Sequence, residues 1–275
     1  MKITFIGGGN MAFALVNGLI QQGYTAAQIN FIEIDAERCR MIKEQFGINA
    51  VTTLSDGIEP VKQGENNVIV LAVKPQQMHG LTQQMAGKLD QQLVISIAAG
   101  IQATDLMRWL GGYPRVVRAM PNTPALVGAG VTGLYAAPEA SEMDRRSAST
   151  IMEAVGTVLW VDEEEMLHTV TAISGSGPAY VFYFIESMQQ AGIKLGLTSE
   201  QSRKLCLQTF QGAVRLANES PDEVSALRAK VTSKGGTTQQ AIQSMDNNDV
   251  MNEIIMAIDA AFARSKAMSD EYSKI

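Results

Sequence analysis

The chain has 275 residues, of which 46% are hydrophobic and 18% are charged. This length fits one or two domains, and the composition is that of a globular protein with a buried core, which excludes long disordered regions. The formal net charge is only -6 and no block of Lys or Arg occurs, which excludes the basic surface that nucleic-acid binding usually requires.

The termini, cysteines and apolar runs indicate where the protein works. Cys39 and Cys206 lie in helical patterns among apolar residues, so we expect buried free thiols and not a disulfide. The chain starts directly with a strand pattern, not with a signal peptide. Apolar runs such as Val68–Val73 are far shorter than the ~20 residues that span a membrane. We therefore expect a cytoplasmic protein with no membrane partner.

The first half of the chain alternates short apolar runs with helical patterns such as Met11–Gln22 and Ala36–Phe46. The runs are rich in Val and Ile and lack polar alternation, which is typical of strands buried on both faces of a parallel sheet. This βαβ rhythm predicts an α/β fold with an N-terminal Rossmann-type, doubly wound, mostly parallel sheet. The expected strands are Ile3–Ile6, Ile29–Ile34, Val68–Val73, Leu93–Ile97 and Arg115–Ala119, and then Val131–Ala136 and Val158–Val161 at the sheet edge, these two separated by a helix over Glu139–Val155.

From Glu163 onward the pattern is helical only, which predicts an all-α C-terminal domain. We expect a dinucleotide-binding domain over 1–162 and a helical substrate and dimerisation domain over 163–275. Thr198 followed by Gln201 indicates a capping box at a helix start. The expected helices are Tyr180–Gly192, Ser199–Asn218, Asp222–Ala229, Thr238–Met245 and Asp249–Lys266.

The segment Val181–Ile185 is apolar on nearly every face of its expected helix, so it must be buried on nearly every side. Two arrangements would bury it. The helix can cross the middle of its own domain, or it can pack against a second subunit. We favour a homo-oligomer, because symmetric dimers are the commonest protein assembly.

A glycine-rich turn follows the first strand and opens a helix. Gly7-Gly8-Gly9-Asn10-Met11-Ala12 has the G-x-G-x-x-A form of the dinucleotide fingerprint. Gly7 allows the tight turn, Gly9 lets a pyrophosphate approach the backbone, and Ala12 lets the helix pack closely on the strand. The pyrophosphate would then meet free N–H groups at the positive end of the helix dipole.

The end of the second strand bears on the choice of cofactor. Glu33 stands where an acidic residue usually binds the 2′-hydroxyl of the adenosine ribose, which favours NAD. A 2′-phosphate would prefer a basic neighbour, and Arg38 and Arg40 are close in sequence. The residues by themselves leave NAD and NADP open.

Later strand ends carry three more motifs. In an open α/β sheet, ligands bind at the carboxyl ends of the strands. Pro75 suits the first turn of a helix, and small residues at the end of the next strand leave room for a nicotinamide ring. The motifs are Ala72-Val73-Lys74-Pro75, Ser96-Ile97-Ala98-Ala99-Gly100 and Met120-Pro121-Asn122-Thr123-Pro124.

Together with Gly7–Ala12, Ser174-Gly175-Ser176-Gly177-Pro178-Ala179-Tyr180 and Gly235-Gly236-Thr237-Thr238, these motifs resemble the pyrroline-5-carboxylate reductase family. The resemblance runs along essentially the whole chain in the family's order. It implies reduction of the cyclic imine 1-pyrroline-5-carboxylate to L-proline, the last step of proline biosynthesis. It also implies NADPH as the cofactor, with NADH possible, and dimers that sometimes assemble as five in a decamer.

The resemblance also implies site residues. The cofactor would be lined by Ile6, Gly7, Gly8, Gly9, Asn10, Met11, Glu33, Ala72, Val73, Lys74, Pro75, Ala98 and Ala99. The substrate would be held by Glu219, Ser233, Gly235, Gly236, Thr237 and Thr238. Two departures stand out: Ser233-Lys234 replaces the Pro that the family usually has before the glycines, and Glu33-Ile34-Asp35 is more acidic than is common.

The expected chemistry explains the absence of metal-binding motifs in the sequence. A protonated imine is already electrophilic, so its reduction needs a hydride and correct placement but no metal. Gly235-Gly236-Thr237-Thr238 precedes a helix, whose first N–H groups would hold the substrate carboxylate. Thr238 would hydrogen-bond the ring nitrogen as the catalytic residue. Alternatively, Thr237 or Thr238 only caps the helix.

Other functions fit the residues less well. A β-hydroxyacid dehydrogenase resembles this plan but has a Lys where this chain has Val181. A 2-hydroxyacid dehydrogenase needs a placed imidazole, and we expect His79 and His168 to be packing or surface residues. A nucleotide-sensing scaffold would not need Thr238 or the Gly235-Gly236 loop. For Gly175 and Gly177 we favour close helix packing over a direct role.

Overall fold

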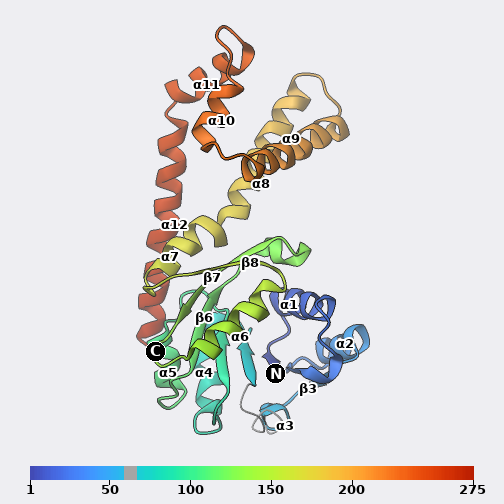
Figure 1. Ribbon diagram of the computed structural model, residues 1–275, viewed down its shortest axis with the longest axis vertical. Helices are drawn as coiled ribbons and strands as arrows, with labels where there is room; N and C mark the ends of the chain where they lie inside the picture. Colours follow the sequence, from blue (N-terminus) through green and yellow to red (C-terminus); the bar gives the residue numbers. More distant parts are fainter. Residues whose placement is uncertain (59–66) are drawn as a thin grey trace. The chain divides into compact units, whose positions relative to one another are not determined.

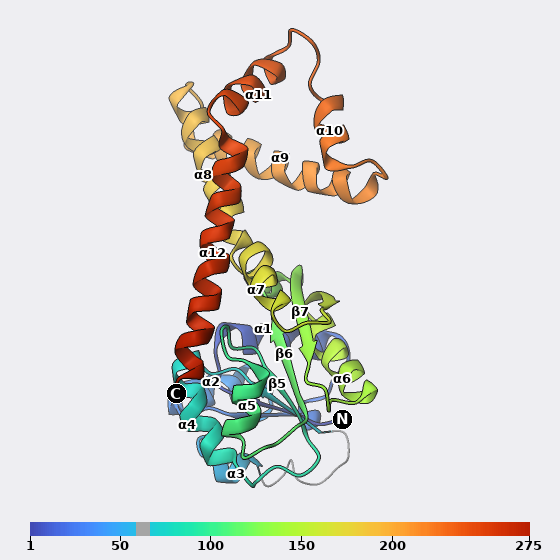
Figure 2. The ribbon, with the colours of Figure 1, turned by 90° about the vertical axis from the view of Figure 1, so that its left-hand side faces the viewer.

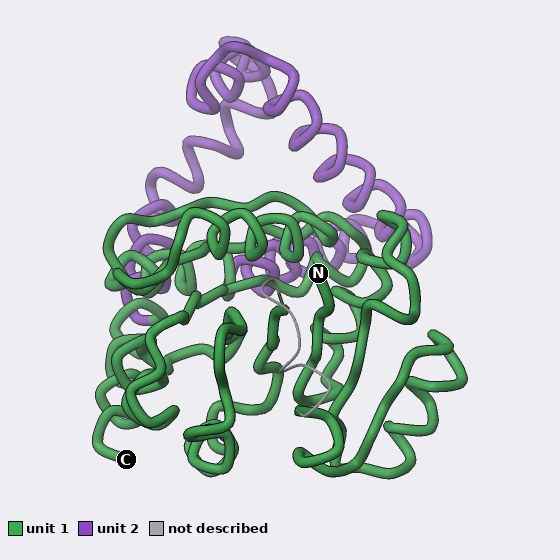
Figure 3. Tube along the Cα trace, turned by 60° about the horizontal axis from the view of Figure 1, so that its bottom comes forward, with its two compact units in different colours: residues 1–176, 261–275 green, residues 177–260 purple. Residues whose placement is uncertain are grey.

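The computed structural model describes residues 1–58 and 67–275. These residues form two compact units (Figure 3). Unit 1 contains residues 1–176 and 261–275, and unit 2 contains residues 177–260. The helix α12 (Val250–Ser273) therefore contributes to both units. The compact units divide after residues 176 and 260, and not after residue 162, where the sequence predicts a functional domain boundary. That boundary stays a prediction.

Within the described ranges, unit 1 is built on a sheet of eight strands in the order β3-β2-β1-β4-β5-β6-β7-β8 (Figures 1 and 2). Neighbouring strands are parallel except β6 and β7, which are antiparallel. The strands are β1 (Ile3–Ile6), β2 (Ile29–Ile32), β3 (Asn49–Val51), β4 (Val68–Leu71), β5 (Leu93–Ser96), β6 (Val116–Met120), β7 (Gly130–Ala136) and β8 (Gly156–Trp160). The strand order reverses beside β1, which is where this fold binds ligands.

Helices cover both faces of this sheet, as continuous apolar strands require. On β4, Val68 and Val70 belong to one buried cluster while Ile69 and Leu71 belong to another. The first cluster packs against α1 (Asn10–Gln21), α2 (Ala36–Phe46) and α6 (Glu142–Glu153). The second packs against α3 (Leu54–Ile58), α4 (Pro75–Met85) and α5 (Ala103–Trp109). The doubly wound prediction is therefore confirmed.

The helical second half is also confirmed. After the short helix α7 (Met166–Val170), the chain forms α8 (Gly177–Lys194), α9 (Ser199–Glu219), α10 (Val224–Lys230), α11 (Thr237–Asn247) and α12. The predicted capping box is present, since the Thr198 side chain accepts from the Gln201 amide. Both cysteines are buried and free, as predicted. Nothing among the described helices is both long enough and apolar enough to cross a membrane.

Helix α8 is not buried by its own chain. No described residue of α8 is buried, and Phe182 and Tyr183 are 65% and 70% exposed. The alternative that this helix crosses the middle of its own domain is therefore wrong. Exposed aromatic side chains of this size mark a surface that binds another protein surface, which agrees with the oligomer that we favoured.

The last turns of α12 belong to unit 1 because side chains join them to it. The His168 ring, on α7, lies 2.8 Å from the Ser265 hydroxyl through Nδ1 and meets the Phe262 ring edge-on. His168 is 4% exposed and Ser265 6% exposed. Burial, the largest cause, lowers the pKa of His168 below its ordinary value of 6.5. The imidazole is therefore a packing residue that the fold keeps neutral.

This depressed pKa predicts a pH-dependent stability. Unfolding returns the His168 pKa to about 6.5, so below that pH the unfolded state binds more protons and is favoured. The free energy of unfolding should be fully retained above pH 6.5, decrease as the pH falls from 6.5 toward the lowered folded-state pKa, and level off below that value. Urea unfolding of the wild type and of His168→Asn between pH 7.5 and 5 measures this. If His168→Asn lost stability with falling pH as steeply as the wild type does, the pH dependence would not come from His168.

Candidate functional site

The turn after β1 is built around a glycine that no other residue can replace without strain. Gly7 has φ +101°, and a Cβ there would lie 2.8 Å from the carbonyl of Ala72 and 2.9 Å from the Val73 side chain. The strand ladder continues on both sides, with the Gly7 amide donating to Ile32 and the Ala72 amide to Ile6. The structure thus brings two predicted cofactor motifs, Gly7–Met11 and Ala72–Pro75, into contact.

The first turn of α1 offers free backbone donors next to open space. Gly9 is the N-cap, and no described side chain caps the helix. The amides of Asn10 and Met11 have no acceptor within the helix. A Cβ at Gly9 would meet only the Ala72 carbonyl oxygen, at 3.9 Å. Backbone N–H donors at a helix N-terminus, next to a turn made of glycines, fit the pyrophosphate of a dinucleotide.

Glu33 lies beside this turn, as predicted, but its carboxylate binds backbone amides. Oε2 accepts from the Gly8 amide at 2.5 Å, and Oε1 accepts from the Asp35 amide at 2.9 Å. Asp35 caps α2 by accepting from Glu37 and Arg38. The Arg38 guanidinium in turn donates to the Gly8 carbonyl at 3.2 Å. Glu33 therefore shapes the glycine turn, a role that its sequence position did not reveal.

The ends of β4 and β5 lie side by side at the same sheet edge. Lys74 is the N-cap of α4 and Pro75 is in its first turn, as predicted. Leu71 at the end of β4 pairs with Ser96 at the end of β5. The segment with Ala72 and Val73 and the segment with Ala98 and Ala99 therefore leave the sheet at the same edge. The Ser96 hydroxyl accepts from the Ala98 amide at 3.3 Å. All the predicted cofactor residues thus lie in unit 1, at the carboxyl ends of β1, β2, β4 and β5.

The predicted substrate residues lie in unit 2. Gly235 has φ +75°, and its amide donates to the Gln239 side chain at 2.6 Å. Gly236 is the N-cap of α11 and no described side chain caps this helix, so the alternative that Thr237 or Thr238 only caps the helix is wrong. Both threonines are instead the first residues of the helix, where backbone amides lack intrahelical acceptors.

Two further predicted residues of unit 2 have identifiable surroundings. Ser233 is exposed and its hydroxyl lies beside Gly236, where a Cβ would meet it at 2.8 Å. Ser233 thus packs on the glycine turn. Glu219 ends α9, and its side chain, 62% exposed, pairs with Arg215 at 2.7 Å. An exposed pair of this kind is easily broken, so Glu219 is free to take another partner.

The turn after β6 holds a contact that the sequence did not predict. Asn122 is 8% exposed; its Nδ2 donates to the Ser174 carbonyl and hydroxyl, and its Oδ1 accepts from the Val131 amide. A Cβ at Gly175 would lie 2.6 Å from the Met120 side chain, which confirms close packing there. A Cβ at Gly177 would have no heavy atom within 4 Å.

The segment around Ser174 also has an unusual backbone. Residues Thr171–Gly175 form a π-helix between α7 and α8, with the Ser176 amide donating to the Thr171 carbonyl at 2.8 Å. Insertions of this kind are costly and often occur at functional sites. The signal available in the sequence was the string of Ser and Gly between two helical patterns.

A buried ion pair connects the loop before α7 to the sheet. The Arg118 guanidinium on β6 lies 2.7 Å from Glu164 Oε1, and the same oxygen accepts from the Ala103 amide at 2.6 Å. The two side chains are 7% and 21% exposed. His79, by contrast, packs its ring on Trp109 with centroids 5.0 Å apart. The two histidines are thus packing residues, as predicted.

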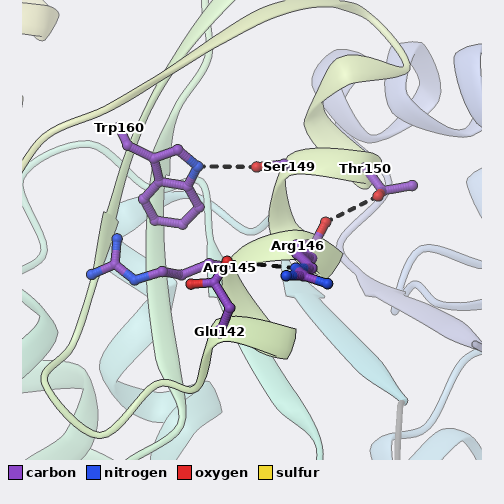
Figure 4. Close-up of a pocket in the computed structure, with 6 residues that line it drawn as sticks. All are labelled: Glu142, Arg145, Arg146, Ser149, Thr150 and Trp160. Carbon is purple, nitrogen blue, oxygen red and sulfur yellow. Dashed lines mark hydrogen bonds and ion pairs between the residues drawn. The ribbon is translucent and has the colours of Figure 1, made fainter.

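A pocket of about 500 Å³ lies on the surface of unit 1 between α6 and β8 (Figure 4). Its lining residues are Glu142, Arg145, Arg146, Ser149, Thr150 and Trp160. The Arg145 guanidinium stacks over the Trp160 ring at 4.9 Å, and Trp160 donates to Ser149 at 3.0 Å. None of the predicted site residues lines this pocket.

Comparison with known proteins was made on sequence and on fold. Residues 164–268 match the family model for pyrroline-5-carboxylate reductase dimerisation, and residues 2–100 match that for coenzyme F420-dependent NADP oxidoreductases. A pyrroline-5-carboxylate reductase of Pseudomonas aeruginosa is 42% identical, with 98% of this chain and 97% of that protein covered. The enzyme of Escherichia coli is 34% identical, with 98% of each chain covered.

Solved structures agree with these sequence relationships. A pyrroline-5-carboxylate reductase from Coxiella burnetii superposes with a TM-score of 0.89 at 40% identity, with 98% of each chain covered. The pyrroline carboxylate reductase of Plasmodium falciparum, solved with NADP bound, gives a TM-score of 0.86 at 30% identity, again over 98% of each chain. The glycine turn, the sheet and the helical second half fit the same family as these relatives. The chain belongs to the pyrroline-5-carboxylate reductase family.

Proposed function

We propose that this chain reduces 1-pyrroline-5-carboxylate to L-proline with NADPH, or with NADH as the alternative, in the last step of proline biosynthesis. The observation that carries the proposal is the turn at Gly7–Met11, where Gly7 lies against the Ala72 backbone and no described side chain caps the start of α1. Relatives that span the whole chain and carry this activity in their names support it.

The cofactor would lie along the carboxyl ends of the strands in unit 1. The amides of Asn10 and Met11 would bind its pyrophosphate, and Glu33 would face the adenosine ribose. Ala98 and Ala99 would leave room for the nicotinamide. Bound NAD(P)H supplies the hydride for the imine carbon.

The substrate carboxylate would be held at the start of α11. There the amides of Thr237, Thr238 and Gln239 lack intrahelical partners, and the helix dipole favours an anion. The Thr238 hydroxyl would hydrogen-bond the ring nitrogen, which becomes the amine of proline. Gly235, Gly236 and Ser233 would shape this turn, and Glu219 would border it.

The assembly and location form part of the same proposal. The exposed aromatic face of α8 would be covered by a second copy, giving a dimer or a decamer of five dimers. Residues 1–162 would form the dinucleotide-binding domain, and residues 163–275 would form the domain that binds the substrate and dimerises. A cytoplasmic location is supported by two buried cysteines that are both free.

The direct test is NADPH and NADH oxidation by the purified chain with the five-membered imine, its six-membered analogue and a panel of hydroxyacids. We expect turnover with the five-membered imine and none with hydroxyacids. Oxidation of a hydroxyacid without imine reduction would overturn the proposal and favour a dehydrogenase.

Gly9→Ala tests the cofactor site. A Cβ at Gly9 has space in the protein, so the free energy of unfolding should change by less than about 1 kcal/mol. The same methyl group would block the approach of a pyrophosphate, and the Kd for NADPH should rise at least about tenfold, measured by nicotinamide fluorescence. Gly80→Ala, in open space on α4, is the control and should bind normally. Unchanged affinity in Gly9→Ala would show that the pyrophosphate lies elsewhere.

A further inference from the structure

The last turn of α12 rests on two turns of the predicted cofactor edge. Tyr272 lies in this last turn, within unit 1. Figures 1 and 2 show the C-terminal end of α12 beside α4 and α5. A Cβ at Gly100 would lie 3.3 Å from the Tyr272 ring, and the Tyr272 hydroxyl accepts from the Gln76 side chain at 3.1 Å. One side chain near the C-terminus thus contacts the chain after β5 and the chain after β4.

Both contacted turns directly continue predicted cofactor residues. Gln76 follows Lys74-Pro75, and Gly100 follows Ala98-Ala99. Gly100 is buried and has φ +80°, so its backbone turns sharply at the position where the ring packs. The absence of a Cβ leaves the space that the Tyr272 ring covers.

Tyr272 is itself held in place by its neighbours. The Ser273 hydroxyl donates to Asp105 at 2.6 Å, and the Arg108 guanidinium donates to the Ser273 carbonyl at 3.3 Å. Asp105 is 6% exposed and also pairs with Arg108 at 2.8 Å. The Tyr272 ring packs on the buried cluster of α4 and α5. The ring therefore stands on a fixed support and can restrain both turns.

We propose that Tyr272 is a positioning residue for the nicotinamide end of the cofactor. This inference rests on the proposed function. By restraining the turns after β4 and β5 in one arrangement, Tyr272 lowers the ordering cost that binding would otherwise include. The contacts of Tyr272 described above are with the turns after β4 and β5 and not with the glycine turn after β1. The adenosine half of the cofactor should therefore be insensitive to changes at Tyr272.

The first measurement uses the protein without ligand. In Tyr272→Ala, backbone amides of 72–77 and 97–101 should exchange with solvent about fivefold faster than in the wild type, while those of 7–16 stay unchanged. Glu271→Ala, next to Tyr272 on the same turn, is the matched control, because it removes an exposed ion pair with Arg264. Tyr272→Phe keeps the ring on Gly100 and should restore nearly wild-type exchange at 97–101, while the amides of 72–77, which lose the hydrogen bond between Gln76 and the hydroxyl, should stay faster.

The second measurement separates the two halves of the cofactor. Tyr272→Ala should raise the Kd for NADPH about fivefold and leave the Kd for 2′-phospho-ADP-ribose, which lacks only the nicotinamide, within about twofold. The KM for NADPH should rise with it, and the KM for the imine should not. Tyr272→Leu, which keeps apolar bulk if the Ala variant loses the docked helix end, should show the same selective loss.

Two results would overturn the proposal. Either Tyr272→Ala and Tyr272→Leu bind NADPH and exchange amides as the wild type does, or NADPH and 2′-phospho-ADP-ribose lose affinity equally, which indicates general loosening of unit 1. A wild-type protein that binds neither ligand would instead refute the proposed function, so the two failures are distinguishable.

Discussion

Thr238→Ala should lower kcat for imine reduction about 100-fold, in the range of losses caused by removing a group that acts on the proton of a reacting atom. Thr238 is the second residue of α11, and no described side chain caps this helix, so the hydroxyl is available to a ligand. The stability should be nearly unchanged, because Ala is the better helix former and no cap is removed. Steady-state kinetics and urea unfolding measure the two effects.

Controls separate the hydroxyl from the helix. Thr238→Ser keeps the hydroxyl and should retain most of the activity. Ser244→Ala removes an exposed hydroxyl further along α11 and should change neither kcat nor stability. If Thr238→Ala turned over as fast as the wild type, the hydroxyl would have no part in the reaction, and the amides of the same turn would be left as the only substrate contacts proposed on α11.

Arg118→Ala should destabilise the fold by about 3 kcal/mol, since removing one partner of a buried ion pair leaves the other charge unpaired. Glu164 would keep its hydrogen bond from the Ala103 amide but lose the charge that balances it. Its side chain is 21% exposed, which lets water compensate in part and places the loss at the lower end of the usual range. The measurement is the free energy of unfolding in urea at one protein concentration, because association also stabilises.

The same chain contains a matched surface pair. Arg146 and Glu142 approach to 3.5 Å on α6 with side chains 73% and 72% exposed. Arg146→Ala should cost less than about 0.5 kcal/mol, because solvent screens exposed charges. Equal losses in Arg118→Ala and Arg146→Ala would mean that burial does not set the strength of these pairs.

Local patterns were sufficient for most of unit 1. Strands such as β1 and β4 are apolar on both faces, so their pattern indicates a covered parallel sheet without knowledge of any partner strand. The short strand β3 was missed because three residues, of which Asn49 is exposed, carry too little periodicity. The end of α12 was also placed too early, since its last turn is held by side chains of α5.

The candidate site divides in the same way. Gly7 and Gly9 were identifiable because a tight turn and a close phosphate approach require residues without a Cβ, and that requirement is visible in the sequence itself. The binding of Glu33 to the Gly8 amide was not, because 25 residues separate them. The contact of Asn122 with Ser174 spans 52 residues and was equally hidden.

The sequence by itself determined the doubly wound sheet, the glycine turn and the helical second half, because each depends on residues close together in the chain. The tertiary structure alone decided that α8 is uncovered and that Tyr272 returns to the turns after β4 and β5. The physical reason is that burial and long-range contacts depend on which surfaces meet, and periodicity reports only which face of an element is apolar.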